Sequence, residues 1–392
     1  MKDFPKIPEG EFVERRKSLQ ERMAKEGIDL LVVNSNDGAT AGQANVRYLT
    51  DFAAHFEPTC CLLPRSGDCV LVTGPESEAL ARVYAKIERI VIAKEYAHPE
   101  EDYPWAKIMS LNSIIGDIAN TQQKPIKKVG IVGQELIEMG VLKALSGKFE
   151  IAPAQHLMNE MRSIKSQNEI KVMQYTYEIA EAGLKAALKA IRDGVREVEV
   201  AAEAEYAMRQ MGSEGTGIDT MVASGADLNR PIIARTTLKK IRPKELVLVT
   251  LIPKYQGYHA ALGRPVSIGK PDHQIVEAVQ LTQKAQEKII ENLNPGKLGR
   301  AVENEGRKVM AEKGLDRYFA YIGLHSVGLV EFEPPIFFSK SDEKIRENMI
   351  LSVDVPCFLA PWGGFRLEDG FMITARGGTP LDSVQRGLVV LD

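Results

Sequence analysis

Cysteine is scarce in this chain of 392 residues, which contains only four, and no two of them form a CxxC pair. Cys60, Cys61, Cys69 and Cys357 also lack the spacing of a disulfide framework or a zinc ribbon. The cysteine pattern therefore excludes small disulfide-rich and zinc-stapled scaffolds. It predicts reduced thiols, as found in the cytosol.

Long apolar runs, a signal-like N-terminus and a charge excess are absent as well. The chain begins MKDFPKIPEGEF and contains no uninterrupted apolar stretch near the ~18 residues of a membrane span. The formal net charge is -3 and the pI is near 6.2. No GxGxxG or Walker pattern occurs. We therefore expect a cytoplasmic protein that binds a small-molecule substrate, with no nucleic acid, no membrane and no nucleotide cofactor.

The residues that are present predict two folded domains of mixed α/β class. Hydrophobic residues make up 44% of the chain, which is enough for sizeable cores. Residues 1–155 alternate helical and strand patterns, which predicts a small α/β domain. Residues 156–392 form the second domain. Near its start, Ser166 and Glu169 of RSIKSQNEI have capping-box spacing, which predicts the N-terminus of a long helix.

The second domain contains an internal repeat. Gly194–Gly212 and Gly296–Gly314 have the same length and agree at several positions, at an offset of 102 residues. The same offset relates Glu245 of ELVLVTLIP to Glu347 of ENMILSVDVP. Such a duplication predicts two halves packed about a pseudo-two-fold axis, with a functional cleft where they meet.

Several ionisable residues of the second domain are candidates for that cleft. Asp354 lies in the apolar run MILSVDVPCFL, and Arg366 and Glu368 share one face of a predicted strand. His325 lies in the apolar segment YIGLHSVGL, and His259 lies in the hairpin TLIPKYQGYHAALGRP. Structural alternatives stay open for each: a carboxylate bound to backbone N–H groups, an Arg–Glu pair, a core histidine and a solvent-facing histidine.

The RSIKSQNEI boundary, the duplicated domain, HSVGLVEFEPP and RLED together resemble the creatinase/aminopeptidase P/prolidase family. The resemblance covers nearly the whole chain. It implies a C-terminal pita-bread domain over 156–392 and a creatinase-type, ribonuclease-H-like N-terminal domain over 1–155. It also implies a homodimer in which the small domain caps the neighbouring cleft.

The peptidases of this family hold two metal ions on five ligands. Carried over, the five ligands and an auxiliary histidine fall on Thr250, Ala261, His325, Asp354, Glu368 and Phe332. Two carboxylates and the auxiliary histidine are thus replaced by a hydroxyl, a methyl group and a phenyl ring. Because uncharged groups cannot neutralise two divalent ions, we expect no dinuclear site.

Creatinase, which cleaves a C–N bond without metal, matches this hairpin better. GYHAALGR resembles its GYxxALxR arm and HSVG its HSxG, while His259 falls where creatinase has a tyrosine. Two departures are clear: its general-base histidine falls on Ile233, and Gly263 replaces its hairpin glutamate. Creatine itself is therefore not the expected substrate.

The main predicted function is metal-independent, creatinase-like hydrolysis of a C–N bond in a small amide or amidine. His325 or His259 would act as general base, while Asp354 and Glu368 would hold a cationic nitrogen. The expected substrate-binding residues are Arg366, Phe332, Glu57, Arg230 and Tyr258.

Three alternatives remain open. The first is a mononuclear-metal hydrolase or lyase with one divalent ion at His325, Asp354 and Glu368. The second is a proline-specific (Xaa-Pro) metallopeptidase, which ranks low because both aspartates are missing. The third is a non-catalytic pita-bread binding protein, against which the buried ionisable cluster argues.

Overall fold

A computed structural model describes residues 4–392, and the chain divides into two compact units. One unit is Ile7–Arg162, and the other is Ser163–Asp392 together with residues 4–6. The mixed α/β class predicted from the sequence is confirmed. No helix within 4–392 is both long enough and apolar enough to cross a membrane.

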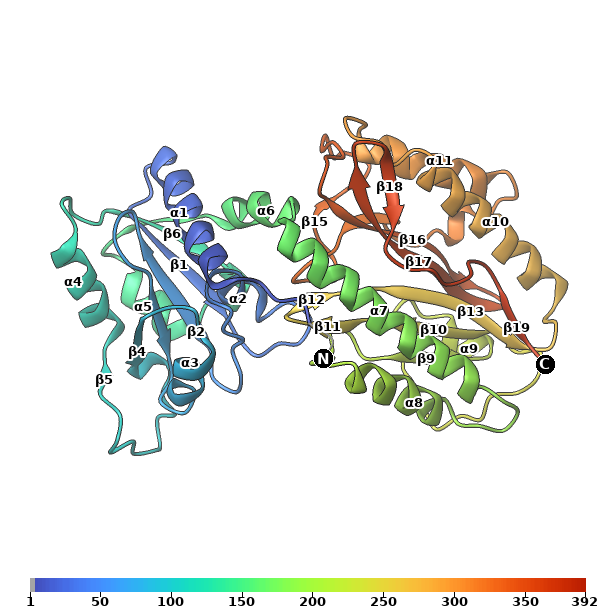
Figure 1. Ribbon diagram of the computed structural model, residues 1–392, viewed down its shortest axis with the longest axis horizontal. Helices are drawn as coiled ribbons and strands as arrows, with labels where there is room; N and C mark the ends of the chain where they lie inside the picture. Colours follow the sequence, from blue (N-terminus) through green and yellow to red (C-terminus); the bar gives the residue numbers. More distant parts are fainter. Residues whose placement is uncertain (1–3) are drawn as a thin grey trace. The chain divides into compact units, whose positions relative to one another are not determined.

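The N-terminal unit is built on a seven-stranded sheet (Figure 1). Its strands are β1 (Leu30–Ser35), β2 (Thr59–Pro64), β3 (Val70–Thr73), β4 (Arg89–Ala93), β5 (Ile108–Met109), β6 (Lys128–Val132) and β7 (Glu150–Pro153), in the order β5-β4-β3-β2-β1-β6-β7. Its helices are α1 (Glu9–Lys25), α2 (Ala44–Thr50), α3 (Glu78–Tyr84), α4 (Leu111–Thr121), α5 (Met139–Leu145) and α6 (Gln155–Ser163), with 3-10 turns η1 (Lys94–Tyr96) and η2 (Gln134–Leu136). Strand residues and α4 supply a continuous apolar core.

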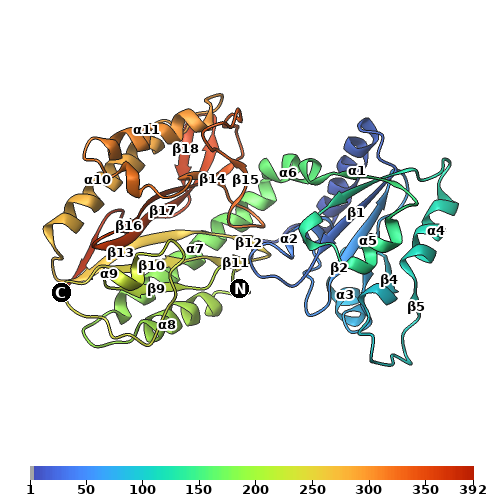
Figure 2. The same ribbon diagram turned by 180° about the vertical axis from the view of Figure 1, so that it is seen from behind.

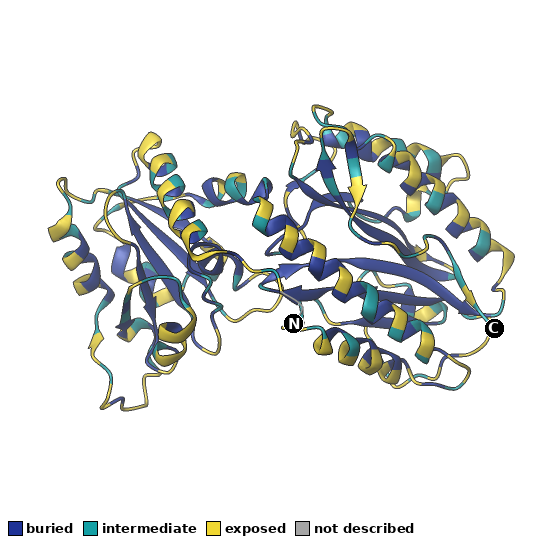
Figure 3. Ribbon diagram, in the orientation of Figure 1, coloured by how far each residue is buried: buried dark blue, intermediate teal, exposed yellow. Residues whose placement is uncertain are grey.

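The C-terminal unit contains a nine-stranded sheet and a small three-stranded one. The large sheet runs β15 (Glu333–Ile336), β14 (Leu324–Ser326), β16 (Ile350–Ala360), β17 (Gly363–Thr374), β13 (Leu262–Ile268), β10 (Val247–Leu251) and β9 (Met221–Ser224), with β18 (Gly377–Pro380) beside β17 and β19 (Val389–Leu391) beside β13. The small sheet holds β12 (Tyr258–His259), β11 (Pro253–Tyr255) and β8 (Gly215–Thr216). The central strands are buried almost throughout (Figure 3).

Two helix pairs pack against this sheet and confirm the pita-bread fold with its internal repeat. The helices are α7 (Gln167–Ala190), α8 (Glu197–Gln210), α9 (Ala226–Asn229), α10 (His273–Ile290) and α11 (Gly299–Ala311), with a 3-10 turn η3 (Asp316–Tyr318). Helices α7 and α8 contact β10 and β9, whereas α10 and α11 contact β16 and β14 (Figures 1 and 2). The capping box at the start of α7 is present: the Glu169 N–H donates to Ser166 Oγ, and the Ser166 N–H donates to the Glu169 carboxylate.

Candidate active site

Strand pairing gathers the candidate residues on one face of the large sheet. Asp354 of β16 pairs with Glu368 of β17, which in turn pairs with Gly263 of β13. His325 of β14 pairs with Ser352, two residues before Asp354. Because strand side chains alternate, His325, Asp354 and Glu368 share this face.

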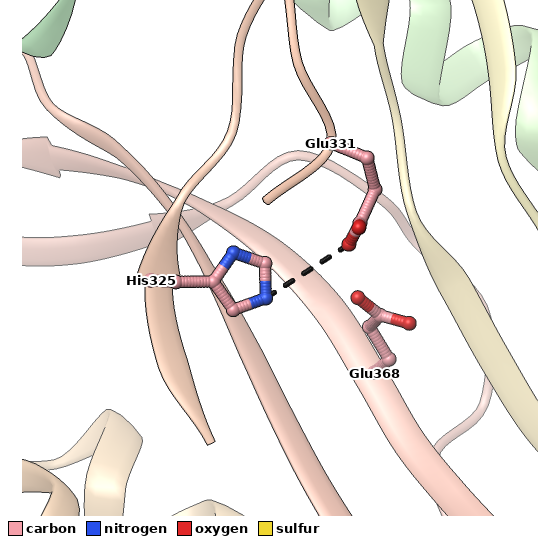
Figure 4. A group of neighbouring side chains, drawn as sticks. All are labelled: His325, Glu331 and Glu368. Atoms are coloured by element: carbon pink, nitrogen blue, oxygen red, sulfur yellow. Dashed lines mark ion pairs between the residues drawn. The ribbon is translucent and has the colours of Figure 1, made fainter. Parts of the chain in front are cut away.

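A buried group of His325, Glu331 and Glu368 has the composition of a metal site (Figure 4). One ligand atom from each residue lies within 4.8 Å of those of the other two. His325 Nε2 lies 3.9 Å from a carboxylate oxygen of Glu331, which is carried by the loop between β14 and β15. One imidazole and two carboxylates are donors that divalent metals accept.

The tautomer of His325 decides what this group can hold. Its Nδ1 lies 3.1 Å from the carbonyl oxygen of Ser326, so Nδ1 carries the proton and donates it. Nε2 then carries no proton and presents a lone pair, and within residues 4–392 it has no hydrogen-bond partner. Burial lowers the pKa of His325 to about 4, so the ring is neutral at pH 7. A buried lone pair facing carboxyl groups is satisfied either by a proton that one of them carries or by a cation bound between them.

Asp354 stands beside this group, not in it. Its Oδ2 accepts a 2.6 Å hydrogen bond from Tyr321 Oη and lies 3.6 Å from Arg366 Nη1. The predicted metal triad of His325, Asp354 and Glu368 therefore differs from the observed group, in which Glu331 takes the place of Asp354. The sequence prediction missed Glu331, although a carboxylate in the apolar stretch GLVEF was an available signal.

The charges of the site balance one divalent ion. The carboxylates of Glu331, Asp354 and Glu368 and the guanidinium of Arg366 are all buried, and their formal charges sum to -2 when fully ionised. Burial raises the pKa of Glu331 to about 7 and also raises the pKa of Asp354 and of Glu368. Clustered carboxyls with raised pKa values are what an ion-free cation site shows.

Among residues 4–392, a second ion has no comparable group of ligands. Thr250 and Ala261, at the positions of the family's two aspartates, are fully buried and uncharged. A Cβ atom on Gly263 would lie 2.5 Å from Cγ of Arg366, so the glycine makes room for the aliphatic part of that side chain. The residues present therefore fit one divalent ion and do not fit two.

The other predicted site residues have local partners. His259 donates its backbone N–H to the Gly328 carbonyl, and its Nδ1 lies 3.1 Å from the same oxygen. Tyr258 Oη donates to Glu169, and Arg230 donates to the carbonyl of Pro361. The Phe332 ring lies 4.3 Å from the His325 ring, centroid to centroid, and is 39% exposed, consistent with a wall of the site.

Glu57 belongs to the N-terminal unit and is engaged there. Its carboxylate accepts hydrogen bonds from the backbone N–H groups of Glu76 and Ser77, just before α3. It therefore caps the start of that helix. Its predicted contact with a substrate stays a prediction.

Two models of known protein families match this chain. A model described as metallopeptidase family M24 matches residues 171–375, and one described as the creatinase/prolidase N-terminal domain matches residues 15–164. The chain therefore belongs to metallopeptidase family M24. The predicted creatinase/aminopeptidase P/prolidase resemblance is confirmed.

Its relatives include proteins named as proline dipeptidases. An Xaa-Pro dipeptidase of Pyrococcus horikoshii is 28% identical, over 96% of this chain and 99% of the relative. That of Pyrococcus furiosus is 28% identical, over 83% of this chain and 90% of the relative. The crystal structure of the prolidase from Pyrococcus horikoshii OT3 superimposes with a TM-score of 0.81 at 26% identity, covering 95% of this chain and 99% of the other.

These findings correct four predictions. The relatives are named Xaa-Pro dipeptidase and prolidase, so the metal-independent creatinase-like function and the low rank given to a peptidase are wrong. The expected absence of a metal cofactor is contradicted, because the matching family is one of metallopeptidases. The inference that the ligands are lost is not supported either, since Glu331 supplies a carboxylate that no matched position indicates.

Proposed function

We propose that this protein is a proline-specific metallopeptidase that hydrolyses Xaa-Pro dipeptides with one divalent ion, held by His325, Glu331 and Glu368. The observation that carries the proposal is the unprotonated Nε2 of His325, buried against two carboxylates with no hydrogen-bond partner in the described chain. The names of the relatives support the substrate class.

Each residue of the site then has a defined task. A bound divalent ion supplies Lewis-acid polarisation of a carbonyl group. The Ser326 carbonyl fixes the ring of His325, and Ser352 Oγ donates a 2.9 Å hydrogen bond to Glu368 Oε1. Both contacts keep ligand atoms turned toward each other.

Asp354 is the proposed general base. Its Oδ2 is held by Tyr321, while its Oδ1 has no hydrogen-bond partner among the described residues. Burial raises the pKa of this carboxyl, which makes the carboxylate a better proton acceptor. Asp354 can therefore take a proton from an attacking water, and Arg366 beside it limits the cost of the negative charge.

The test compares Ala-Pro with Ala-Ala as substrates for chelator-treated protein, with and without added Mn²⁺. We expect ion-dependent turnover of Ala-Pro and much slower turnover of Ala-Ala. The His325→Ala variant should lose activity, whereas His273→Ala, an exposed histidine of α10, should keep it. Absence of ion-dependent Ala-Pro hydrolysis by the wild type would refute the proposal. The homodimer and the cytoplasmic location remain proposals from sequence.

A further inference from the structure

The carboxylate of Glu331 is carried by an irregular loop, not by a strand. The loop, residues 327–332, joins β14 to β15, and it follows directly on Ser326 at the end of β14. Strand pairing fixes His325 and Glu368, but it does not fix Glu331. Other contacts must therefore hold this third ligand at its distance from the other two.

Lys165 supplies those contacts from the segment before α7. Its Nζ donates to Ser326 Oγ at 2.8 Å and to Glu333 Oε1 at 3.1 Å, at the two ends of the loop. The Lys165 and Glu333 side chains are only 1% and 3% exposed. One buried ammonium thus joins the beginning of the loop to its end.

The middle of the loop is bound to Glu333 as well. Glu333 Oε2 accepts a hydrogen bond from the backbone N–H of Val330, next to Glu331. A Cβ atom on Gly328 would lie 2.2 Å from Glu333 Oε1, so the glycine lets the loop close over this carboxylate. His259 adds a bond from outside by donating its backbone N–H to the Gly328 carbonyl.

Lys165 is itself well fixed. Its backbone N–H donates to the carbonyl of Asn348, and the next residue caps α7. The ammonium and Glu333 neutralise each other, so the pair leaves the charge of the ion site unchanged. Apart from the charge of Glu333, which raises the pKa of His325, the pair acts on that site through geometry.

We propose that Lys165 is a positioning residue that sets the affinity of the ion site by holding the 327–332 loop, so that Glu331 stays within ligand distance of His325 and Glu368. This inference rests on the single-ion site of the proposed function. Support of metal ligands by surrounding contacts typically changes metal affinity about 10–100-fold.

The experiment measures Mn²⁺ dissociation constants by calorimetry and the visible spectrum of Co²⁺-loaded protein. The main variant is Lys165→Met combined with Glu333→Leu, which removes both charges together and leaves no buried ion unpaired. Lys165→Met alone is the second variant, and Lys171→Met, an exposed lysine of α7, is the matched control.

We expect the double variant to unfold at a denaturant concentration close to that of the ion-free wild type, but to bind Mn²⁺ about 10-fold or more weakly. Its Co²⁺ spectrum should shift, because one carboxylate ligand is no longer held in place. Lys171→Met should match the wild type in all respects. Unchanged affinity and an unchanged spectrum in the double variant would overturn the positioning role alone. Failure of the wild type to bind any ion would instead refute the proposed function.

Discussion

Arg366 Nη1 lies 3.6 Å from Glu368 Oε2. The two residues belong to the same strand, β17, and Arg366 comes two positions before Glu368. Both side chains are buried, and Gly263 on the neighbouring strand leaves the space that the aliphatic part of the arginine side chain occupies. The arginine therefore contributes one fixed positive charge to the carboxylates of Glu331, Asp354 and Glu368. A divalent ion would supply the two further positive charges that neutralise them.

Replacing Arg366 by Met should make the folded protein dependent on the ion. Removing one partner of a buried ion pair costs about 3–5 kcal/mol, because the remaining charges are left uncompensated. We expect a loss of that size in ion-free protein, measured by urea unfolding, and partial recovery with Mn²⁺. Arg235→Met, at an arginine 81% exposed, should change stability little. Equal loss with and without Mn²⁺ would contradict this account.

The pH dependence of the ion-free protein should report Glu331. Burial raises its pKa to about 7 in the folded state, against 4.5 ordinarily, so between these values the folded state binds more protons than the unfolded state. Stability from this group is present below pH 4.5 and is lost as pH rises through 7. The pKa of His325 is lowered from its ordinary 6.5 to about 4 in the folded state. The stability contributed by His325 therefore rises with pH between these two values, opposite to that of Glu331.

Comparison with Glu331→Gln separates these two contributions. The free energy of unfolding of the wild type, minus that of the variant, should fall across about pH 4.5 to 7, by at most about 3 kcal/mol. Chemical denaturation of chelator-treated protein at several pH values measures this difference. A difference that stays constant with pH would show that the Glu331 carboxyl is not perturbed by burial.

Local patterns in the sequence predict the parts of the site that lie on regular structure. Alternation along β17 places Arg366 and Glu368 on one face, and the apolar run around Asp354 indicates a buried carboxylate. The capping box fixes the start of α7 correctly. These predictions succeed because a strand or helix has a fixed period, so spacing determines direction.

Glu331 could not be found in this way, because an irregular loop has no period that tells where a side chain points. From the uncharged side chains of Thr250 and Ala261, the sequence predicts no dinuclear site and a metal-independent function. That prediction assumes that ligands come only from matched positions. In the fold, Glu331 lies outside those positions but comes within ligand distance of His325 and Glu368, and its loop is held at both ends by Lys165, 166 residues earlier.

Glu57 should matter for the N-terminal unit and not for the ion site. Glu57→Ala leaves the N–H groups of Glu76 and Ser77 without their acceptor, which should cost about 0.5–2 kcal/mol. Thermal unfolding measures this loss, and Glu88→Ala, at an exposed position, is the control. A rise in KM for Ala-Pro at unchanged stability would instead favour the substrate contact predicted from sequence.

The number of bound ions should change if the two uncharged positions are converted to carboxylates. Thr250 and Ala261 are fully buried, and Thr250 Oγ1 has no hydrogen-bond partner in the described part of the chain. The double variant Thr250→Asp with Ala261→Asp adds two negative charges, which should destabilise ion-free protein because buried carboxylates lack counter-charges. Added Mn²⁺ should restore stability, and metal analysis should rise from one equivalent to two. The Thr250→Ala variant should still bind one equivalent of metal, since this substitution adds no charge. Two equivalents in the wild type would show that the site holds a second ion through groups other than these carboxylates, and the charge argument for a single ion would then fail.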